Sequence, residues 1–393
     1  MPSKYSLLAA GLLHATTVLG ASQLIASHFT GNLYSLTLSD NNDLSITSQT
    51  RSGNFWPAWL DFDSQSNTLY VVDEANWFPP NGVTTFTVAA DGSLTQNNDG
   101  QTVTSGAEVH STLYGGNDGR SFLALAHYGS SKISTFQLPL TSSSRALQEF
   151  TFRLSGPKSN PRQDAPHPHM VVPDPTGRFL FSADLGDDQI RAYAIDSATG
   201  LLTECPATAT NPGDGPRHLV FYNDCNAPSA IFVLNELSNS VGVWNVDYSG
   251  ACPSLALTQT ISTFPENVQA PQGAKAAAIQ ERDGFVYVSN RRDRSFGQQE
   301  DSLATFQIGI SDDGNVELDF IEATSAHSFF PRTMQINAAG DLVAVGGQTS
   351  ATVAIIERNA TTGLLGDLVA SVRVGQAGTL DEENGLSAVI WVE

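Results

Sequence analysis

Apolar and polar residues alternate in seven similar segments, each of which ends in a turn rich in Asp, Asn, Ser or Gly. Alternation with a period of two predicts β-strands with one buried face, and helical periodicity is almost absent. The segments begin at residues 32, 83, 132, 189, 240, 302 and 352, so neighbouring starts are 49 to 62 residues apart. In order they read NLYSLTLSDNNDLS, VTTFTVAADGSL, KISTFQLPLTSSSRAL, QIRAYAIDSATGLL, SVGVWNVDYSGACPSL, SLATFQIGISDDGNV and TVAIIERNATTGLL. Such spacing indicates an internal repeat.

Each segment follows a second β-rich stretch, and in six of the seven units a third stretch precedes that one. Units of about 53 residues that contain short strands and no helices predict an all-β fold, a seven-bladed β-propeller with four-stranded blades. The first unit lacks its leading strand, whereas the chain ends in the unassigned β-like segment GLSAVIWVE. We therefore expect the N- and C-terminal strands to pair and close the ring, which removes an open sheet edge.

The first 20 residues have the layout of a secretory signal peptide. Lys4 precedes the apolar stretch LLAAGLLHATTVL, which is too short to span a bilayer, and the small residues Gly20 and Ala21 offer a cleavage point. We expect a signal peptide over residues 1–20, a single propeller domain over residues 21–393, and a secreted, extracellular protein. A buried N-terminal helix is the alternative for the first segment.

Cys205, Cys225 and Cys252 lack the CxxC spacing and the clustered histidines of a metal site. In an oxidising compartment we expect Cys205 to pair with Cys225, because these residues flank one predicted strand. The sequon at Asn359 lies in a turn-like segment and is compatible with export. The residues alone leave the disulfide pairing and the glycosylation of Asn359 open.

The formal net charge of −21 excludes some classes of partner. Strong acidity repels phosphate backbones and anionic lipids, so we expect neither nucleic acid binding nor membrane insertion. An anionic small molecule would need a local cationic pocket.

Basic residues recur in phase with the repeat, although the chain has few of them. Alignment of the third stretches gives a column at the start of the strand, which contains Ala58, His110, His169, Arg217, Lys275 and Arg332. Alignment of the second stretches gives a column at the strand end, which contains His28, Glu74, His127, Asp184, Glu236, Arg291 and Gln348. The innermost strands of a propeller border its central channel, so we expect the two columns to face each other near one mouth.

These columns indicate a binding site for a small anion, because surface charges have no reason to keep phase with a fold. Paired arginines would bind a carboxylate in bidentate fashion, and His169, Asp184 and Glu236 could move protons. Salt bridges between blades are the alternative for Arg217 and Arg291, and a structural hydrogen bond is the alternative for His169. We predict that the remaining polar members bind substrate or line the channel; they are His110, His127, Asp184, Lys275, Arg332 and Gln348.

Other kinds of chemistry have no support in the sequence. It contains no GxSxG nucleophile motif and no glycine-rich phosphate loop, and it predicts no metal site and no cofactor. His167 lies one step outside the start of its strand, so we expect it to be exposed.

Four segments resemble the blade signatures of the seven-bladed lactonase family, which includes bacterial 6-phosphogluconolactonases and fungal 3-carboxy-cis,cis-muconate lactonizing enzymes (carboxymuconate cyclases). They are HPHMVVPDPTGRFLFSADLGDDQIRAYAID, GPRHLVFYND with FVLNELSNSVGVW, FVYVSNRRDRS and FFPRTMQINAAGDLVAV. The resemblance covers the chain after residue 20 and is strongest over residues 165–350. It implies an active site of one histidine, two arginines and one glutamate, which correspond to His169, Arg217, Arg291 and Glu236.

The residues and the resemblance together predict a secreted enzyme that opens or closes a lactone on a carboxylate-bearing molecule without a cofactor. Arg217 and Arg291 would bind carboxylates, and His169 would transfer a proton with help from Glu236. The alternative is a non-catalytic secreted or cell-surface propeller, such as an adhesin or antigenic exoprotein that contacts a host surface. The four polar residues favour the enzyme, whereas the export signal favours the alternative.

Overall fold

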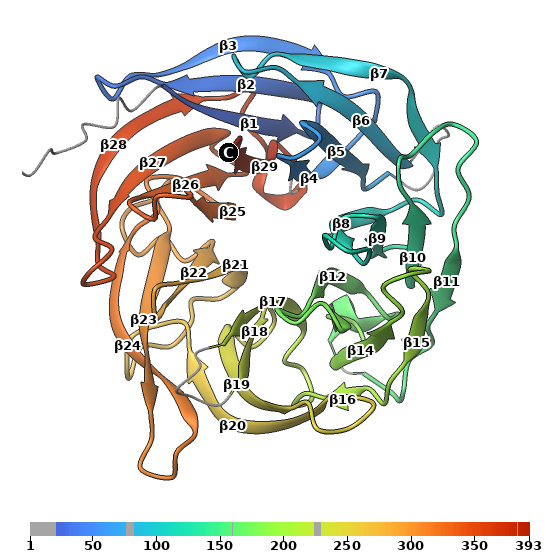
Figure 1. Ribbon diagram of the computed structural model, residues 1–393. Helices are drawn as coiled ribbons and strands as arrows, with labels where there is room; N and C mark the ends of the chain where they lie inside the picture. Colours follow the sequence, from blue (N-terminus) through green and yellow to red (C-terminus); the bar gives the residue numbers. More distant parts are fainter. Residues whose placement is uncertain (1–20, 76–81, 159, 224–228, 383) are drawn as a thin grey trace, which may run out of the picture.

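The computed structural model describes residues 21–75, 82–158, 160–223, 229–382 and 384–393. These residues form seven antiparallel sheets arranged in a ring about a central axis (Figure 1). Each sheet has four strands, and one sheet carries an additional short strand. In six sheets the strands follow sequence order from the axis outward, whereas the remaining sheet has β29 innermost, followed by β1, β2 and β3. The predicted seven-bladed propeller is therefore confirmed. Within the ranges given above, no helix combines the length and the apolar character that a membrane crossing needs.

The first four blades are built as follows. One consists of β29 (Leu386–Trp391), β1 (Ser22–His28), β2 (Asn32–Leu38) and β3 (Leu44–Arg51). The next contains β4 (Pro57–Asp63), β5 (Thr68–Asp73), β6 (Gly82–Val88) and β7 (Leu94–Val103). It is followed by β8 (Glu108–Tyr114), β9 (Phe122–His127), β10 (Lys132–Gln137) and β11 (Gln148–Thr151). The fourth contains β12 (Pro168–Pro173), β13 (Phe179–Asp184), β14 (Gln189–Ile195) and β15 (Leu202–Glu204), with β16 (Thr208–Ala209) beside β14.

The remaining three blades have the same plan. The fifth contains β17 (Pro216–Tyr222), β18 (Ala230–Asn235), β19 (Ser240–Asp247) and β20 (Ser254–Ser262). The sixth contains β21 (Lys275–Arg282), β22 (Phe285–Arg291), β23 (Ser302–Ile310) and β24 (Val316–Ser325). The seventh contains β25 (Pro331–Ile336), β26 (Leu342–Gly347), β27 (Thr352–Arg358) and β28 (Leu365–Arg373). Two single-turn 3₁₀ helices, η1 (Pro161–Gln163) and η2 (Leu380–Glu382), lie in loops.

Hydrophobic cores lie between neighbouring blades, because both faces of each sheet are covered. Phe181 of β13 packs with Ile231 of β18 and Trp244 of β19, and all three side chains are buried. The outermost strands are different, since β20 exposes most of its residues. Burying one such aromatic side chain contributes about 1.5–3 kcal/mol, so these inter-blade contacts hold the ring together.

The ring closes through the two ends of the described chain. β1 pairs with β29 in antiparallel register, with Leu24 opposite Trp391 and His28 opposite Leu386. The hydroxyl groups of Ser27 and Ser387 also hydrogen-bond across this pair at 2.8 Å. The predicted closure is thus confirmed, and the C-terminal strand becomes the innermost strand of the blade that the N-terminal strands build.

A β-bulge lies near the start of most innermost strands. The register shifts between Pro216 and His218 in β17, and equivalent shifts occur in β4, β8, β12 and β25. The additional residue of a bulge points in a direction that a regular strand would not give it. Arg217 occupies this place in β17, as His169 does in β12 and Arg332 in β25. The bulges therefore bring these three side chains to one mouth of the ring.

A disulfide bond joins Cys205 to Cys252, with 5.6 Å between their Cα atoms. Cys205 follows β15 and Cys252 precedes β20, so the bond links the outer strands of two neighbouring blades. The prediction that Cys205 pairs with Cys225 is wrong, because outer strands of adjacent blades come together at the rim of the ring. Cys225 itself lies outside the described residues, as does the predicted signal peptide over residues 1–20.

Candidate active site

A cavity of about 230 Å³ lies where the innermost strands begin and the second strands end. We call it the cationic cavity. Its walls carry His169, Tyr128, two carboxylates and five cationic side chains. The carboxylates are Glu74 and Glu236, and the cations are Arg162, Arg217, Lys275, Arg291 and Arg332. Positive charges thus exceed negative ones by three in a chain whose net charge is −21.

Gly215 connects the two elements that provide Arg217 and Glu236. Its carbonyl accepts a hydrogen bond from the Glu236 amide at 2.8 Å, and its own amide donates to Asp188 Oδ1 at 2.9 Å. Its φ of +61° lies in the left-handed region, and an added Cβ would lie 2.4 Å from Leu237 Cγ. Only glycine fits here without strain, so GPRH is a structural as well as a chemical motif.

Glu236 is the centre of an ion cluster in the cationic cavity. Its Oε2 atom lies 2.9 Å from Arg217 Nε and 2.9 Å from Arg291 Nη2, while Oε1 lies 2.9 Å from Arg162 Nη1. Burial alone would raise the pKa of this carboxyl group, but the charges of Arg291, Arg162 and Arg217 together hold the pKa well below its usual range. Glu236 is therefore ionised at every physiological pH and serves as an anchor for three guanidinium groups.

His169 is a buried, neutral imidazole. Its side chain is in contact with the rings of Tyr128 and His218, and its Nδ1 atom has no hydrogen-bond partner among the described residues. Burial lowers the pKa of His169 well below 6.5, and the charges of Arg217 and Arg332 lower it further. At neutral pH the ring is therefore unprotonated and able to accept a proton.

Arg332 and Lys275 line the same cavity, as the sequence predicted. Arg332 Nη2 lies 3.2 Å from Glu74 Oε2, and its guanidinium lies over the ring of Phe29 at 5.3 Å from the centroid. Arg332 and Glu74 also border a neighbouring hollow of about 740 Å³, whose walls include Phe29, Trp56 and Gln376. The cationic cavity therefore opens beside room for a larger part of a ligand.

Two members of the predicted columns lie inside their blades instead of facing the cationic cavity. His127 Nε2 lies 2.7 Å from Ser134 Oγ and its Nδ1 lies 3.0 Å from the Gly106 carbonyl oxygen. Asp184 forms an ion pair with Arg191 at 2.7 Å. Successive side chains of a strand point to opposite faces, and both residues precede by one position those equivalent to Glu236, so neither lines the cationic cavity.

The other predicted positions also differ from expectation. His110 follows the bulged residue of β8 and lines a separate pocket deeper in the ring. Gln348 is buried and lies outside the walls of the cationic cavity, while His28 borders the larger hollow. His167 is buried, because its ring stacks on Tyr128 at 4.1 Å and bonds to the Tyr128 carbonyl oxygen, so the expectation of exposure was wrong.

Two cavity residues were missed by sequence reasoning. Arg162 lies in η1, which begins after Asn160, whose side chain accepts a hydrogen bond from the Arg162 amide. Tyr128 directly follows β9, in the position equivalent to Glu236. The Asn-Pro-Arg sequence is a signal for a helix start. Moving the His127 position of the strand-end column by one residue, to match Glu236, would have placed Tyr128.

The geometry suits chemistry that develops negative charge. The fixed guanidinium groups can stabilise an oxyanion without reorganising, and His169 can take up and return a proton. No group of three or more His, Cys, Asp or Glu side chains arranged for a metal ion occurs in the described part of the chain.

Comparison with known proteins finds lactonases among the similar families, sequences and structures. A family model described as lactonase, 7-bladed beta-propeller, matches residues 23–381. A probable 6-phosphogluconolactonase of Arthroderma benhamiae is 29% identical over 311 residues, which are 78% of this chain and 75% of the relative. A 6-phosphogluconolactonase of Bacillus subtilis is 25% identical over 320 residues, covering 81% and 84%. The structure of a periplasmic gluconolactonase of Pseudomonas aeruginosa superposes with a TM-score of 0.75 and 25% identity, covering 95% of this chain and 99% of that one.

Proposed function

Because the chain belongs to the lactonase family of seven-bladed β-propellers, we propose that it hydrolyses a lactone that carries a negatively charged group. The observation that supports this most directly is the excess of three positive charges in the cationic cavity. Such a cavity attracts an anion into a chain that otherwise repels it. The neighbouring hollow, which shares Glu74 and Arg332, gives room for the uncharged part of the substrate.

In the proposed reaction His169 acts as the general base. It takes a proton from a water molecule, whose oxygen bonds to the lactone carbonyl carbon, and Arg217 and Arg291 stabilise the resulting oxyanion. The bond between that carbon and the ring oxygen then breaks, and the imidazolium returns its proton to the leaving alkoxide. The product is an open hydroxy acid, which releases one proton to solution at neutral pH.

Glu236 acts as a positioning residue in this scheme. Its ion pairs with Arg217, Arg291 and Arg162 fix the direction of all three guanidinium groups. Its depressed pKa makes it a poor proton donor, so the proton transfers are assigned to His169. This differs from the sequence-based expectation that Glu236 shares the proton transfer.

Phosphorylated sugar lactones are the first substrate class to consider. Two relatives are named as 6-phosphogluconolactonases, and a phosphate would fit an arginine-rich site. A gluconolactone without phosphate is suggested by the periplasmic relative. Closure of a lactone on a carboxymuconate would require the same cations to bind carboxylates, and it is the alternative reaction that the sequence predicted.

We also propose that the protein is exported. The charged and apolar layout of residues 1–20 supports this. A disulfide between Cys205 and Cys252 is typical of an oxidising compartment. Asn359, within its sequon, lies on the surface in the turn between β27 and β28.

A proton-release assay tests the enzymatic proposal. The purified protein is mixed with 6-phosphogluconolactone and with glucono-δ-lactone, and acid release is compared with that of the His169→Asn variant. We expect the parent protein to hydrolyse 6-phosphogluconolactone faster than glucono-δ-lactone, and the His169→Asn variant to lack this activity. Equal rates for parent, variant and buffer would refute hydrolysis. Loss of ultraviolet absorbance with a carboxymuconate would assign lactone closure, and inactivity in every assay would favour the non-catalytic alternative.

A further inference from the structure

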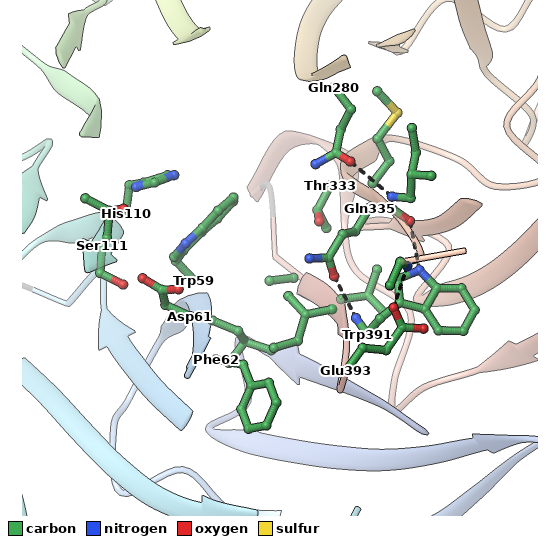
Figure 2. A pocket seen from close by; sticks show the side chains of 18 residues that line it. Trp59, Asp61, Phe62, His110, Ser111, Gln280, Thr333, Gln335, Trp391 and Glu393 are labelled. Atoms are coloured by element: carbon green, nitrogen blue, oxygen red, sulfur yellow. Dashed lines mark hydrogen bonds between the residues drawn. The ribbon is translucent and has the colours of Figure 1, made fainter. Parts of the chain in front are cut away.

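A second pocket of about 390 Å³ lies deeper along the innermost strands (Figure 2). Its walls come from β4, β8, β21, β25 and β29, and it shares no residue with the cationic cavity. Asp61 lies three positions after the bulged residue of β4, which corresponds to about 10 Å along a strand. We call this space the deep pocket.

Aromatic rings separate the deep pocket from the cationic cavity. The ring of His218 lies 5.3 Å from that of His169 on one side and 5.7 Å from that of His110 on the other. The indole of Trp59 stacks on His110 at 4.2 Å and lies 5.7 Å from His218. These four rings lie between the two sites, so the deep pocket and the cationic cavity are separate spaces.

One wall of the deep pocket presents polar atoms that the described protein does not satisfy. Asp61 Oδ2 is buried without a hydrogen-bond partner, and so are both ring nitrogens of His110. Buried polar atoms are nearly always paired in folded proteins. His110 is 4% exposed, so these atoms face the pocket or the rings around it and not bulk water.

The opposite wall presents amide donors. Gln280 Oε1 accepts from the Ile336 amide at 3.0 Å, and Gln335 Oε1 accepts from the Trp391 amide at 2.6 Å. The amide nitrogens of both side chains point toward the side where Trp59 and Asp61 lie (Figure 2). Donors and acceptors therefore face each other across the pocket.

The charge of the deep pocket is opposite to that of the cationic cavity. Among the residues that the structure describes, no Lys or Arg lines it, and its ionisable members besides His110 are Asp61 and Glu393. Glu393 Oε2 accepts a hydrogen bond from the Ala338 amide at 2.5 Å. Burial, with the neighbouring Asp63, raises the pKa of Asp61 to about 7. An anion would therefore be repelled here.

We propose that the deep pocket binds an uncharged polyhydroxylated molecule, such as a free sugar. Hydroxyl groups both donate and accept, and therefore fit a wall of carboxyl and imidazole groups that faces carboxamides. The indole of Trp59 offers an apolar surface to the CH groups of a sugar ring, and the pocket volume is in the range of small-molecule sites. This site is independent of the proposed lactone hydrolysis.

Calorimetric titration of the full chain tests the proposal. The probes are glucose, galactose, maltose and sorbitol, with gluconate and glucosamine as anionic and cationic controls. We expect at least one neutral probe to bind, and to bind at least tenfold more weakly to Asp61→Ala. His169→Asn, a change in the cationic cavity, should retain the affinity. Lactone hydrolysis by Asp61→Ala should equal that of the parent, since Asp61 lies outside the cationic cavity.

Each other outcome contradicts the proposal. Absence of binding by all neutral probes overturns it, as does binding that His169→Asn abolishes and Asp61→Ala retains. Tighter binding of glucosamine than of every neutral probe would assign a cation site instead. If Asp61→Ala does not fold, Trp59→Leu replaces it, and the same loss of affinity is expected.

Discussion

Arg217 Nε lies 2.9 Å from Glu236 Oε2, and both residues are almost fully buried. Arg217 lies in β17, the first strand of its blade, and Glu236 directly follows β18, the second strand. A buried ion pair is costly to break, because removal of one partner leaves the other charge without compensation. Here the same carboxylate also holds Arg291 and Arg162. Glu236 therefore controls both the stability and the shape of the cationic cavity.

Replacement of Glu236 by Gln should destabilise the protein by about 3–5 kcal/mol, because buried guanidinium groups lose their counter-charge. Turnover should fall roughly a hundredfold, since misplaced groups lose catalytic geometry. Denaturant unfolding and the proton-release assay measure the two effects. Glu204→Gln makes the same chemical change at an exposed position and should leave both quantities unchanged. A stable Glu236→Gln protein would mean that the arginines need no anchor.

Replacement of His169 by Asn should lower kcat roughly a hundredfold or more with little change in KM, because proton transfer is lost while binding groups remain. In the parent protein the pKa of His169 lies well below 6.5, so the unprotonated base persists as the pH falls through 6.5. The kcat profile should therefore stay level there and decline only at lower pH. A midpoint near 6.5 would argue against this assignment.

Replacement of Arg217 by Ala should raise KM for a charged lactone through the loss of about 1.5–3 kcal/mol of charge-assisted hydrogen bonding. The matching uncharged lactone serves as the control, and its KM should change less. Rates at increasing salt concentration give a second measurement, because screening weakens attraction of the anion in the parent protein. Equal effects on both lactones would show that Arg217 does not bind the charged group of the substrate, and would leave it the oxyanion role alone.

Replacement of Asp61 by Asn should stabilise the protein at pH 8. The folded-state pKa is raised to about 7 from an ordinary value of 3.8, so the folded state holds the proton more tightly than the unfolded state. The stabilising effect of protonation is present below pH 4 and is lost as the pH rises to 7. The stability difference between Asp61→Asn and parent should therefore grow from pH 4 to pH 7 and then level off. Asp312→Asn, at an exposed position, is the control.

Replacement of Val389 by Asp should abolish cooperative unfolding or lower its midpoint strongly, because this residue of β29 is 1% exposed in the core of the closing blade. Ile310→Asp places the same charge at a position that is 49% exposed and should be tolerated. Circular dichroism and gel filtration distinguish the two. A folded Val389→Asp protein would show that the closing strand contributes little.

The fold could be predicted from the sequence because each blade repeats the same alternation, and hydrophobic burial demands that pattern wherever the blade stands in the ring. The family was likewise predictable, since GPRH combines the turn at Gly215 with the site residue Arg217, and SNR contains the site residue Arg291. His169, Arg217, Glu236 and Arg291 do meet in one cavity. Their catalytic roles stay predictions.

Other features depend on details that the pattern does not contain. The sequence does not mark which residue is bulged, so His110 was aligned with Arg217 although Arg217 is the bulged residue of β17 and His110 lies one step beyond the bulged residue of β8. Arg162 reaches Glu236 from a loop of another blade, at a separation of 74 residues. Cys205 meets Cys252 only because outer strands of adjacent blades converge.

Closure of the ring by β29 also has a consequence for biosynthesis. A ribosome makes β1 long before β29, so the first blade must wait for its inner strand while the other blades pair as they emerge. The cationic cavity draws Arg217 and Arg332 from different blades, so its final geometry forms only after translation has passed Trp391. A chain that is released early would expose the β1 edge and become a target for aggregation or proteolysis. A closed ring therefore requires a chain that has been made at least as far as Trp391.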